Sequence, residues 1–175
     1  MKYQVAIAPL KLNWFKKQKL KSVIYKNLRT HMYCLGDMKS TYHTNAYLHK
    51  LTEFAFFENR LNFFSQKVLN KNIRICSMWA NVGSYGSKVS PHNHIKDDYS
   101  NYEVDYLFKT SGICGAYYLQ KPKLSGNFIS GNDVVVDINE NDLILFSPHM
   151  IHQTEINKSQ KDRIVISFNG YLDTP

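Results

Sequence analysis

The chain has few cysteines and no long hydrophobic run, and both absences narrow what it can be. Its three cysteines, Cys34, Cys76 and Cys114, are odd in number and form no CxxC pair. This pattern argues against a disulfide framework or a zinc knuckle and favours a reducing compartment. The apolar run at residues 5–10 is interrupted by Pro9 and is too short for a signal-peptide core or a membrane span. We therefore expect a soluble, cytoplasmic protein with no membrane partner.

Acidic residues are also scarce relative to basic ones. Asp and Glu number 14 against 22 Lys and Arg, which gives a formal charge of +8 and a pI near 9.3. Such a balance permits attraction to nucleic acid, but no recognition motif accompanies the charge. Much of the excess is lysine before residue 30. The sequence therefore does not favour a nucleic-acid partner.

What is present describes one β-rich domain, residues 1–175, with helices at its N-terminal end. Residues 1–10 are expected to form a strand, while residues 11–30 and 46–70 carry apolar side chains, Phe15 among them, at helical spacing. From residue 72 short β-branched and aromatic runs alternate with turn signals. These runs are Ile73–Trp79, Gly112–Leu119, Gly126–Ile129, Asp133–Val136, Leu143–Phe146, His152–Ile156 and Arg163–Tyr171. We predict a helical support (residues 1–71) and an antiparallel jelly-roll barrel (residues 72–171).

Histidines are placed as metal ligands would be. His92 and His94 stand one residue apart, so in an extended strand their side chains share a face. His152 begins a later strand, and Arg163 begins the last one. Three imidazoles can hold Fe, Zn, Ni or Cu, and a guanidinium nearby can hold a carboxylate. The pattern predicts a metal site beside an anion site. The alternative is ordinary surface or loop histidines and a surface arginine paired with Asp162 or a glutamate.

Other candidates compete for these roles. His149 follows Pro148 and would face away from His152 in a strand, so only one of them can be a ligand, and His152 is preferred. Tyr117 and Tyr118 alternate faces, so one hydroxyl points into the barrel. His31 and His43 have no partner in the sequence and are interpreted as structural or exposed.

Five segments together resemble one family. They are Ser77–Val82, Pro91–His94, Ser111–Leu119, Leu143–His152 and Arg163–Asn169, and they lie within residues 72–171. In order and spacing they are similar to the 2-oxoglutarate- and Fe(II)-dependent oxygenases, in particular the small bacterial and phage-type members close to prolyl hydroxylases. The resemblance implies a mainly β fold, a double-stranded β-helix of the cupin type, in a bacterial or phage-infected host cell.

The resemblance also implies a chemistry and a set of roles. His92 and His152 match the two histidine ligands of Fe(II), and His94 stands where prolyl-hydroxylase-like members place an aspartate. Arg163 and Tyr118 match the residues that bind the 2-oxoglutarate co-substrate, and Asn81 is a further pocket residue. The implied reaction is hydroxylation of an unidentified substrate with release of succinate and CO2. No catalytic residue beyond the metal site is indicated.

Two departures from the family pattern keep alternatives open. A non-haem iron oxygenase normally uses two histidines and a carboxylate, so Asp97 or Asp98 is an alternative ligand to His94. The stretch 97–111 is longer than a hairpin loop and is either a lid or an insertion. The competing functions are a three-histidine, cupin-like dioxygenase that does not use 2-oxoglutarate, and a non-catalytic β-barrel that serves in an assembly. Arg163 favours the 2-oxoglutarate-dependent hydroxylase over the cupin-like dioxygenase.

Overall fold

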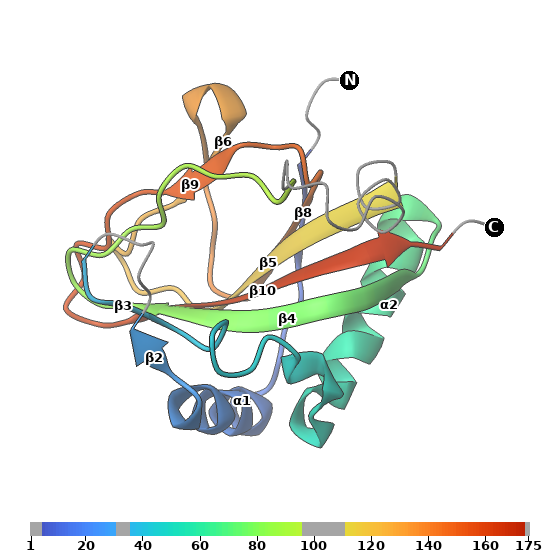
Figure 1. Cartoon of the computed structure of the whole chain (residues 1–175), viewed down its shortest axis with the longest axis horizontal. Helices are drawn as coiled ribbons and strands as arrows, with labels where there is room; N and C mark the ends of the chain where they lie inside the picture. Colours follow the sequence, from blue (N-terminus) through green and yellow to red (C-terminus); the bar gives the residue numbers. More distant parts are fainter. Residues whose placement is uncertain (1–4, 31–35, 96–110, 174–175) are drawn as a thin grey trace.

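Two antiparallel sheets face each other in the computed structural model, which describes residues 5–30, 36–95 and 111–173 (Figure 1). The small sheet has the order β7 (Val134–Val136), β6 (Phe128–Ser130), β9 (His152–Thr154). A 3-10 turn, Gly131–Asp133, joins β6 to β7. The large sheet has seven strands, in the order β1 (Ala6–Pro9), β8 (Asp142–Phe146), β5 (Gly112–Gln120), β10 (Arg163–Leu172), β4 (Ile73–Gly83), β3 (Met38–Ser40), β2 (Arg29–Thr30).

The segment that carries the first two histidines extends the small sheet. The backbone N–H of His92 donates to His152 O at 3.1 Å, and the N–H of His152 donates back to His92 O at 2.9 Å. Further along, the N–H of Thr154 donates to Val89 O. This segment therefore lies beside β9, opposite β4 and β10. The arrangement is the double-stranded β-helix that the sequence predicts.

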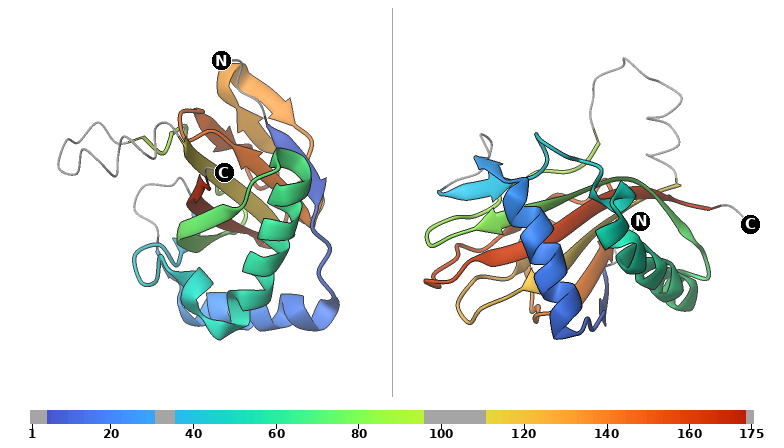
Figure 2. Two further views of the ribbon diagram at one scale, coloured as in Figure 1. Left: turned by 90° about the vertical axis from the view of Figure 1, so that its right-hand side faces the viewer. Right: turned by 90° about the horizontal axis from the view of Figure 1, so that it is seen from below.

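Two helices cover the outer face of the large sheet. Figure 2 shows α1 (Trp14–Lys26) and α2 (Ala55–Leu69) lying across it. In α2 the buried positions Phe57, Leu61 and Ser65 recur every four residues, which gives the helix one inward face. Phe57 packs on Tyr117 of β5 with ring centroids 5.0 Å apart. The helices thus support the sheet from behind and leave the space between the two sheets to the site.

The two neighbouring tyrosines of β5 face opposite layers. Tyr117 belongs to the core between the helices and the large sheet, whereas Tyr118 belongs to the cluster between the sheets with Phe128 and Phe146. The alternation follows from the pleat of a strand, in which successive side chains point to opposite faces. Tyr118 is therefore the inward tyrosine.

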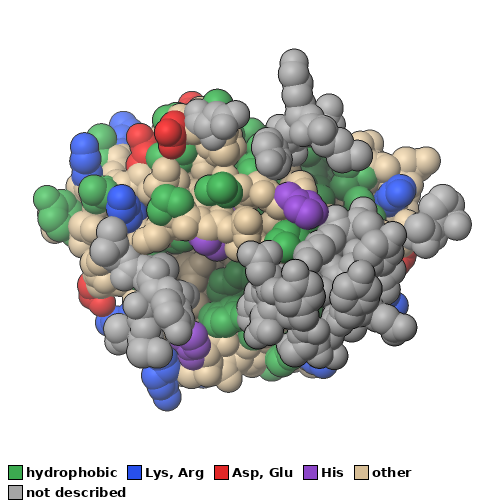
Figure 3. Space-filling view, turned by 45° about the horizontal axis from the view of Figure 1, so that its top comes forward, with side chains coloured by type: hydrophobic (Ala, Val, Ile, Leu, Met, Phe, Trp, Pro, Cys, Tyr) green, Lys and Arg blue, Asp and Glu red, His purple; other side chains and the backbone are tan. Residues whose placement is uncertain are grey.

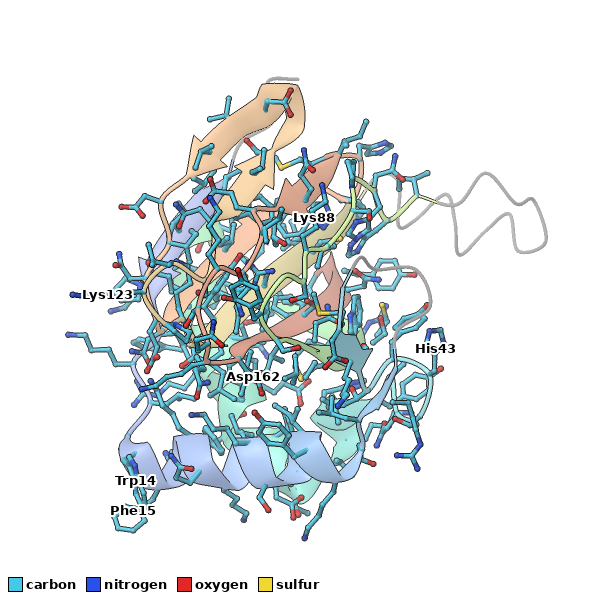
Figure 4. The ribbon with its side chains drawn as sticks, turned by 90° about the vertical axis from the view of Figure 1, so that its left-hand side faces the viewer. Trp14, Phe15, His43, Lys88, Lys123 and Asp162 are labelled. Carbon is cyan, nitrogen blue, oxygen red and sulfur yellow. The ribbon has the colours of Figure 1, made fainter. Side chains whose placement is uncertain are left out.

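Several sequence expectations need correction. The helix expected at residues 46–70 begins later, because two short 3-10 turns, Leu48–Lys50 and Thr52–Phe54, precede α2. It ends as expected at Asn70, which takes the left-handed conformation (φ 53°). Phe15, expected on an apolar helix face, is 76% exposed. With Trp14 it projects into solvent from the start of α1 (Figure 4). Strands β2 and β3 were not predicted.

The strands expected from residue 73 onward are all present. β4 continues four residues beyond the predicted end at Trp79, and β6 and β9 are shorter than predicted. Within the described part of the chain, no helix is both long and apolar enough to cross a membrane.

Close packing of β5 on β10 depends on Gly115. A Cβ placed there would lie 2.2 Å from the ring of Phe168, which is fully buried. We expect Gly115→Ala to lower the free energy of unfolding by about 1–3 kcal/mol through overpacking, measured by urea denaturation. Gly131→Ala is the matched control, because its Cβ would make only an ordinary contact at 3.5 Å. Equal stability of the two variants would contradict this packing.

Candidate metal centre and anion pocket

A cavity of about 460 Å³ opens between the two sheets. This volume falls within the range of about 300–1,000 Å³ that is typical of small-molecule sites. Figure 3 shows a hollow on this face, bordered by histidine and hydrophobic side chains. The cavity lining includes every described residue that was expected to bind the metal or the co-substrate: Asn81, His92, His94, Tyr118, His152 and Arg163.

The structure brings the three predicted ligands together. One ring nitrogen from each of His92, His94 and His152 lies within 4.8 Å of the other two. The ring centroids of His92 and His152 are 4.3 Å apart, and that of His94 lies 5.3 Å from His92 and 5.1 Å from His152. Pairing of the His92 segment with β9 produces this cluster, because it sets residues 60 positions apart in sequence side by side.

Each ring is oriented through its Nδ1 atom. Nδ1 of His92 lies 2.9 Å from Ser90 O, and Nδ1 of His152 lies 3.1 Å from Met150 O. A backbone carbonyl can only accept, so in both rings Nδ1 carries the hydrogen and Nε2 keeps its lone pair. Metal-binding histidines are oriented in the same way, by a hydrogen bond from the nitrogen that does not bind the metal.

Burial keeps two of the rings neutral. Loss of solvent lowers the pKa of His152 to about 3, with a further contribution from the neighbouring His92 and His94. Loss of solvent likewise lowers the pKa of His94 to about 4, against the opposing effect of its bond to Asn169. At neutral pH both rings are therefore uncharged, which is the form that binds a metal ion.

Arg163 is a buried cation that forms no ion pair with any carboxylate of the described residues, although the charge of nearby Glu155 partly opposes the lowering of its pKa by burial. Its side chain is 2% exposed, and among the described residues it forms no ion pair. Its guanidinium donates to Ser125 O, Glu155 O (3.1 Å) and Thr154 Oγ1 (2.8 Å). The Glu155 carboxylate instead accepts the backbone N–H of Asn127. A buried charge is costly unless it is paired, so the pocket is suited to an anionic ligand.

The anion site lies close to the histidines. His152 and Thr154 are on the same face of β9, which places their Cα atoms about 6.6–6.8 Å apart. Because Thr154 Oγ1 accepts from Arg163, the guanidinium contacts the residue next to His152 on that face of β9, and both line the same cavity. Within the described residues three of its five N–H donors are engaged, which leaves two for a carboxylate.

Two predicted pocket residues lie beside Arg163. Tyr118 is buried, and the guanidinium of Arg163 opposes the rise in the Tyr118 pKa that burial causes. Asn81 lies on β4, and both it and Tyr118 pair with Val165 of β10. The side-chain oxygen of Asn81 is buried and accepts no hydrogen bond from any described residue. A ligand in the pocket could supply that donor.

The remaining residues considered in the sequence analysis do not join the histidine cluster of the described structure. His149 lies outside the histidine cluster among the described residues. His43, interpreted from the sequence as structural or exposed, is exposed but also lines the outer cavity with Tyr42, whose ring packs edge-on against Trp79 at 5.2 Å (Figure 4). Asp97, Asp98 and all but the last residue of the stretch 97–111 lie outside the described residues.

Sequence reasoning assigned no role to Asn169 or Cys114, although both lie against His94. Nδ1 of His94 is 2.5 Å from Asn169 Oδ1 and 3.2 Å from Cys114 Sγ. Strand alternation could have found Asn169, since counting in twos from Arg163 along the last strand reaches it on the same face. Nothing in the sequence indicates that Cys114 contacts a histidine.

Comparison with known proteins identifies the fold. No family model and no curated protein matches the sequence. Among solved structures, HygX from Streptomyces hygroscopicus with nickel, 2-oxoglutarate and hygromycin B bound is 13% identical, with a TM-score of 0.69 over 97% of this chain and 83% of that one. A Pseudomonas putida prolyl-4-hydroxylase is 9% identical, with a TM-score of 0.63 over 99% and 94%. The chain therefore has the double-stranded β-helix fold of 2-oxoglutarate-dependent oxygenases.

A third similar structure is the carbocyclase SnoK from nogalamycin biosynthesis, described as non-haem and α-ketoglutarate-dependent. It is 10% identical, with a TM-score of 0.70 over 98% of this chain and 80% of that one. Proteins with this fold therefore include a hydroxylase and a carbocyclase. The fold alone does not define the reaction of this chain.

The histidine cluster predicts metal-dependent stability. At a free Ni(II) concentration of 100 times the dissociation constant, binding adds about 2.7 kcal/mol, which raises the melting temperature of a chain of this size by about 5–10 °C. We expect this rise in the wild-type protein and in His149→Ala, and its loss in His152→Ala. Thermal denaturation with and without metal measures it. An unchanged rise in His152→Ala would show that the metal binds elsewhere.

Proposed function

We propose that this protein is a 2-oxoglutarate- and Fe(II)-dependent oxygenase that hydroxylates a substrate and releases succinate and CO2. One observation carries the proposal: Arg163 is a buried cation with no described ion-pair partner, and it lines the same cavity as three converging histidines. A dicarboxylate can bind both features at once, with one end at the metal and the other at the guanidinium. A metal centre without such a co-substrate has no use for this arginine.

The donor set fits a divalent transition metal. His92, His94 and His152 would hold it through three imidazoles, of which His92 and His152 have Nδ1 committed to backbone carbonyls. When bound, Fe(II) supplies the redox chemistry that couples decarboxylation of 2-oxoglutarate to oxidation of the substrate. His94 is proposed as the third ligand, because its ring lies within the cluster. Asp97 remains the alternative.

The remaining pocket residues would position the co-substrate. Arg163 would pair with its distal carboxylate through the donors that no described residue engages, and this pairing would neutralise the buried charge. The Tyr118 hydroxyl, which burial keeps protonated, would donate to the same carboxylate. Asn81 would contact the ligand from the β4 side. The sheets would exclude bulk water from this part of the pocket.

The same observations rank the competing functions. A cupin-like dioxygenase that acts without 2-oxoglutarate would need the histidines but would leave Arg163 uncompensated. A non-catalytic barrel would need neither. The likeness to HygX and SnoK supports the 2-oxoglutarate-dependent function, because the HygX structure contains 2-oxoglutarate and SnoK is α-ketoglutarate-dependent. We propose the reaction for one domain of residues 1–175 in the cytoplasm.

Binding of 2-oxoglutarate is expected to depend on both ends of the pocket. Anaerobic addition of Fe(II) and 2-oxoglutarate should give a weak visible charge-transfer band in the wild-type protein. We expect the band to be absent in His152→Ala, which loses a metal ligand. Arg163→Met should retain metal binding but require at least about tenfold more 2-oxoglutarate, because a charged hydrogen-bonded pair contributes about 1.5–3 kcal/mol. Absorption spectroscopy measures both effects.

Lys88→Met is the matched control for Arg163→Met, because it removes a cation outside the pocket lining (Figure 4). It should leave the band and the 2-oxoglutarate requirement unchanged. If iron raises the melting temperature while 2-oxoglutarate gives neither a band nor a further rise, the hydroxylase function is wrong and the cupin-like alternative is favoured.

The identity of the third ligand has its own test. Removing a metal ligand in His94→Ala should weaken metal binding by more than about 100-fold, because even an outer-sphere partner contributes about 10–100-fold. His94→Asp should restore binding, since a carboxylate completes the ligand set that iron oxygenases normally use. Calorimetric titration with Ni(II) compares the variants. Wild-type affinity in His94→Ala would favour Asp97 as the third ligand.

A further inference from the structure

His94 differs from the other two histidines in what holds its ring. Nδ1 of His92 and of His152 each bonds to the backbone carbonyl two residues before it. The Nδ1 of His94 does not follow this pattern: it lies against a side chain, Asn169 Oδ1, while the carbonyl two residues before it, His92 O, accepts the backbone N–H of His152 at 2.9 Å. The ring of His94 is therefore oriented by a residue distant in the sequence and not by its own backbone.

Asn169 supplies the oxygen that lies against Nδ1 of His94. Asn169 is on β10, and its Oδ1 lies 2.5 Å from Nδ1 of His94. The register of β10 against β4 shifts between Asn169 and Gly170, and such bulges commonly redirect a side chain next to a site. Gly170 permits the shift, because a Cβ there would lie 2.8 Å from Arg74 O. The β-bulge thus lies directly after Asn169, whose side chain lines the cavity.

Cys114 indicates which end of the amide faces the ring. The Cys114 thiol, which pairs with Asn169 in register on β5, donates to Asn169 Oδ1 at 3.3 Å. The same oxygen lies against Nδ1 of His94. An oxygen between two donors is satisfied, whereas the amide nitrogen in its place would meet a second donor in the thiol. This orientation makes His94 Nδ1 the donor and leaves Nε2 with the lone pair.

We propose that Asn169 is a positioning residue that fixes His94 as an Nε2 metal donor while adding no charge to the centre. The inference rests on the proposed metal centre. In many metal sites a carboxylate accepts from the ligating histidine and makes it a stronger donor. Asn169 is neutral, so it would orient the ring of His94 without adding negative charge. Substitutions at this position can therefore test orientation and charge separately.

Two substitutions separate orientation from charge. Asn169→Leu keeps a similar volume but removes the acceptor, so we expect Ni(II) affinity to fall by about 10–100-fold. Asn169→Asp keeps the acceptor and adds a negative charge, so we expect affinity equal to or higher than that of the wild-type protein. Calorimetric titration of the full-length chain measures both. Ser167→Ala is the matched control, since Ser167 lines the same cavity from β10 and its loss leaves the acceptor and the Cys114 thiol in place; its affinity should stay within about threefold.

The tautomer of His94 gives a readout that does not involve the metal. Long-range proton–nitrogen correlation spectra of the metal-free protein, with the His94 signals assigned from His94→Gln, distinguish an Nδ1–H ring from an Nε2–H ring. We expect Nδ1–H in the wild-type protein and in Ser167→Ala. In Asn169→Leu we expect a substantial Nε2–H population, because the Cys114 sulfur that still lies against Nδ1 is only a weak acceptor. A merely structural role for Asn169 would not move this equilibrium.

The outcomes distinguish this inference from the proposed function. Wild-type protein that binds no Ni(II) would overturn the metal centre itself. If the wild-type protein binds Ni(II) and His152→Ala does not, the centre stands. Unchanged affinity and an unchanged Nδ1–H tautomer in Asn169→Leu would then overturn the role of Asn169 alone. Loss of affinity in Asn169→Asp equal to that in Asn169→Leu would likewise overturn the acceptor role.

Discussion

The paired backbone hydrogen bonds between His92 and His152 are the interaction on which the site depends. They join a segment without regular secondary structure of its own to strand β9, at 3.1 and 2.9 Å. The pairing completes the small sheet opposite β10 and sets two imidazole rings 4.3 Å apart. His94 lies in the same segment, and its ring is oriented from a third strand, by Asn169 of β10. Sheet closure and ligand geometry are therefore one constraint, not two.

Charge is distributed unevenly in the barrel interior. At the histidine end, burial lowers the pKa of His94 and His152 well below neutrality, so these two rings are uncharged. The opposite end carries the buried cation of Arg163, which only neutral groups contact among the described residues. A divalent metal at the first end would leave the whole interior positive. Binding of a dianion across both ends would offset that charge, which is the physical basis for proposing 2-oxoglutarate.

Much of the architecture could be predicted because it depends on local pattern. Alternation in β5 predicted that only one of Tyr117 and Tyr118 faces inward, and the structure shows that it is Tyr118. Helical spacing predicted the end of α2, but not its start, because the preceding 3-10 turns carry similar apolar residues. Phe15 matched a helical period and is nonetheless 76% exposed, since periodicity does not reveal whether a neighbour covers that face. Strands β2 and β3 are too short to give a signal.

The sequence by itself determined the candidate set: a histidine pair at strand spacing, a distant third histidine and an arginine that begins the final strand. Residue type and period carry that information, because both are local properties of the chain. Tertiary structure alone decided that the three rings converge, that Arg163 lacks a described carboxylate partner, and that Asn169 orients His94. Each of these depends on which strands become neighbours and on how deeply they are buried. Such relations join residues far apart in the chain, and no local pattern encodes them.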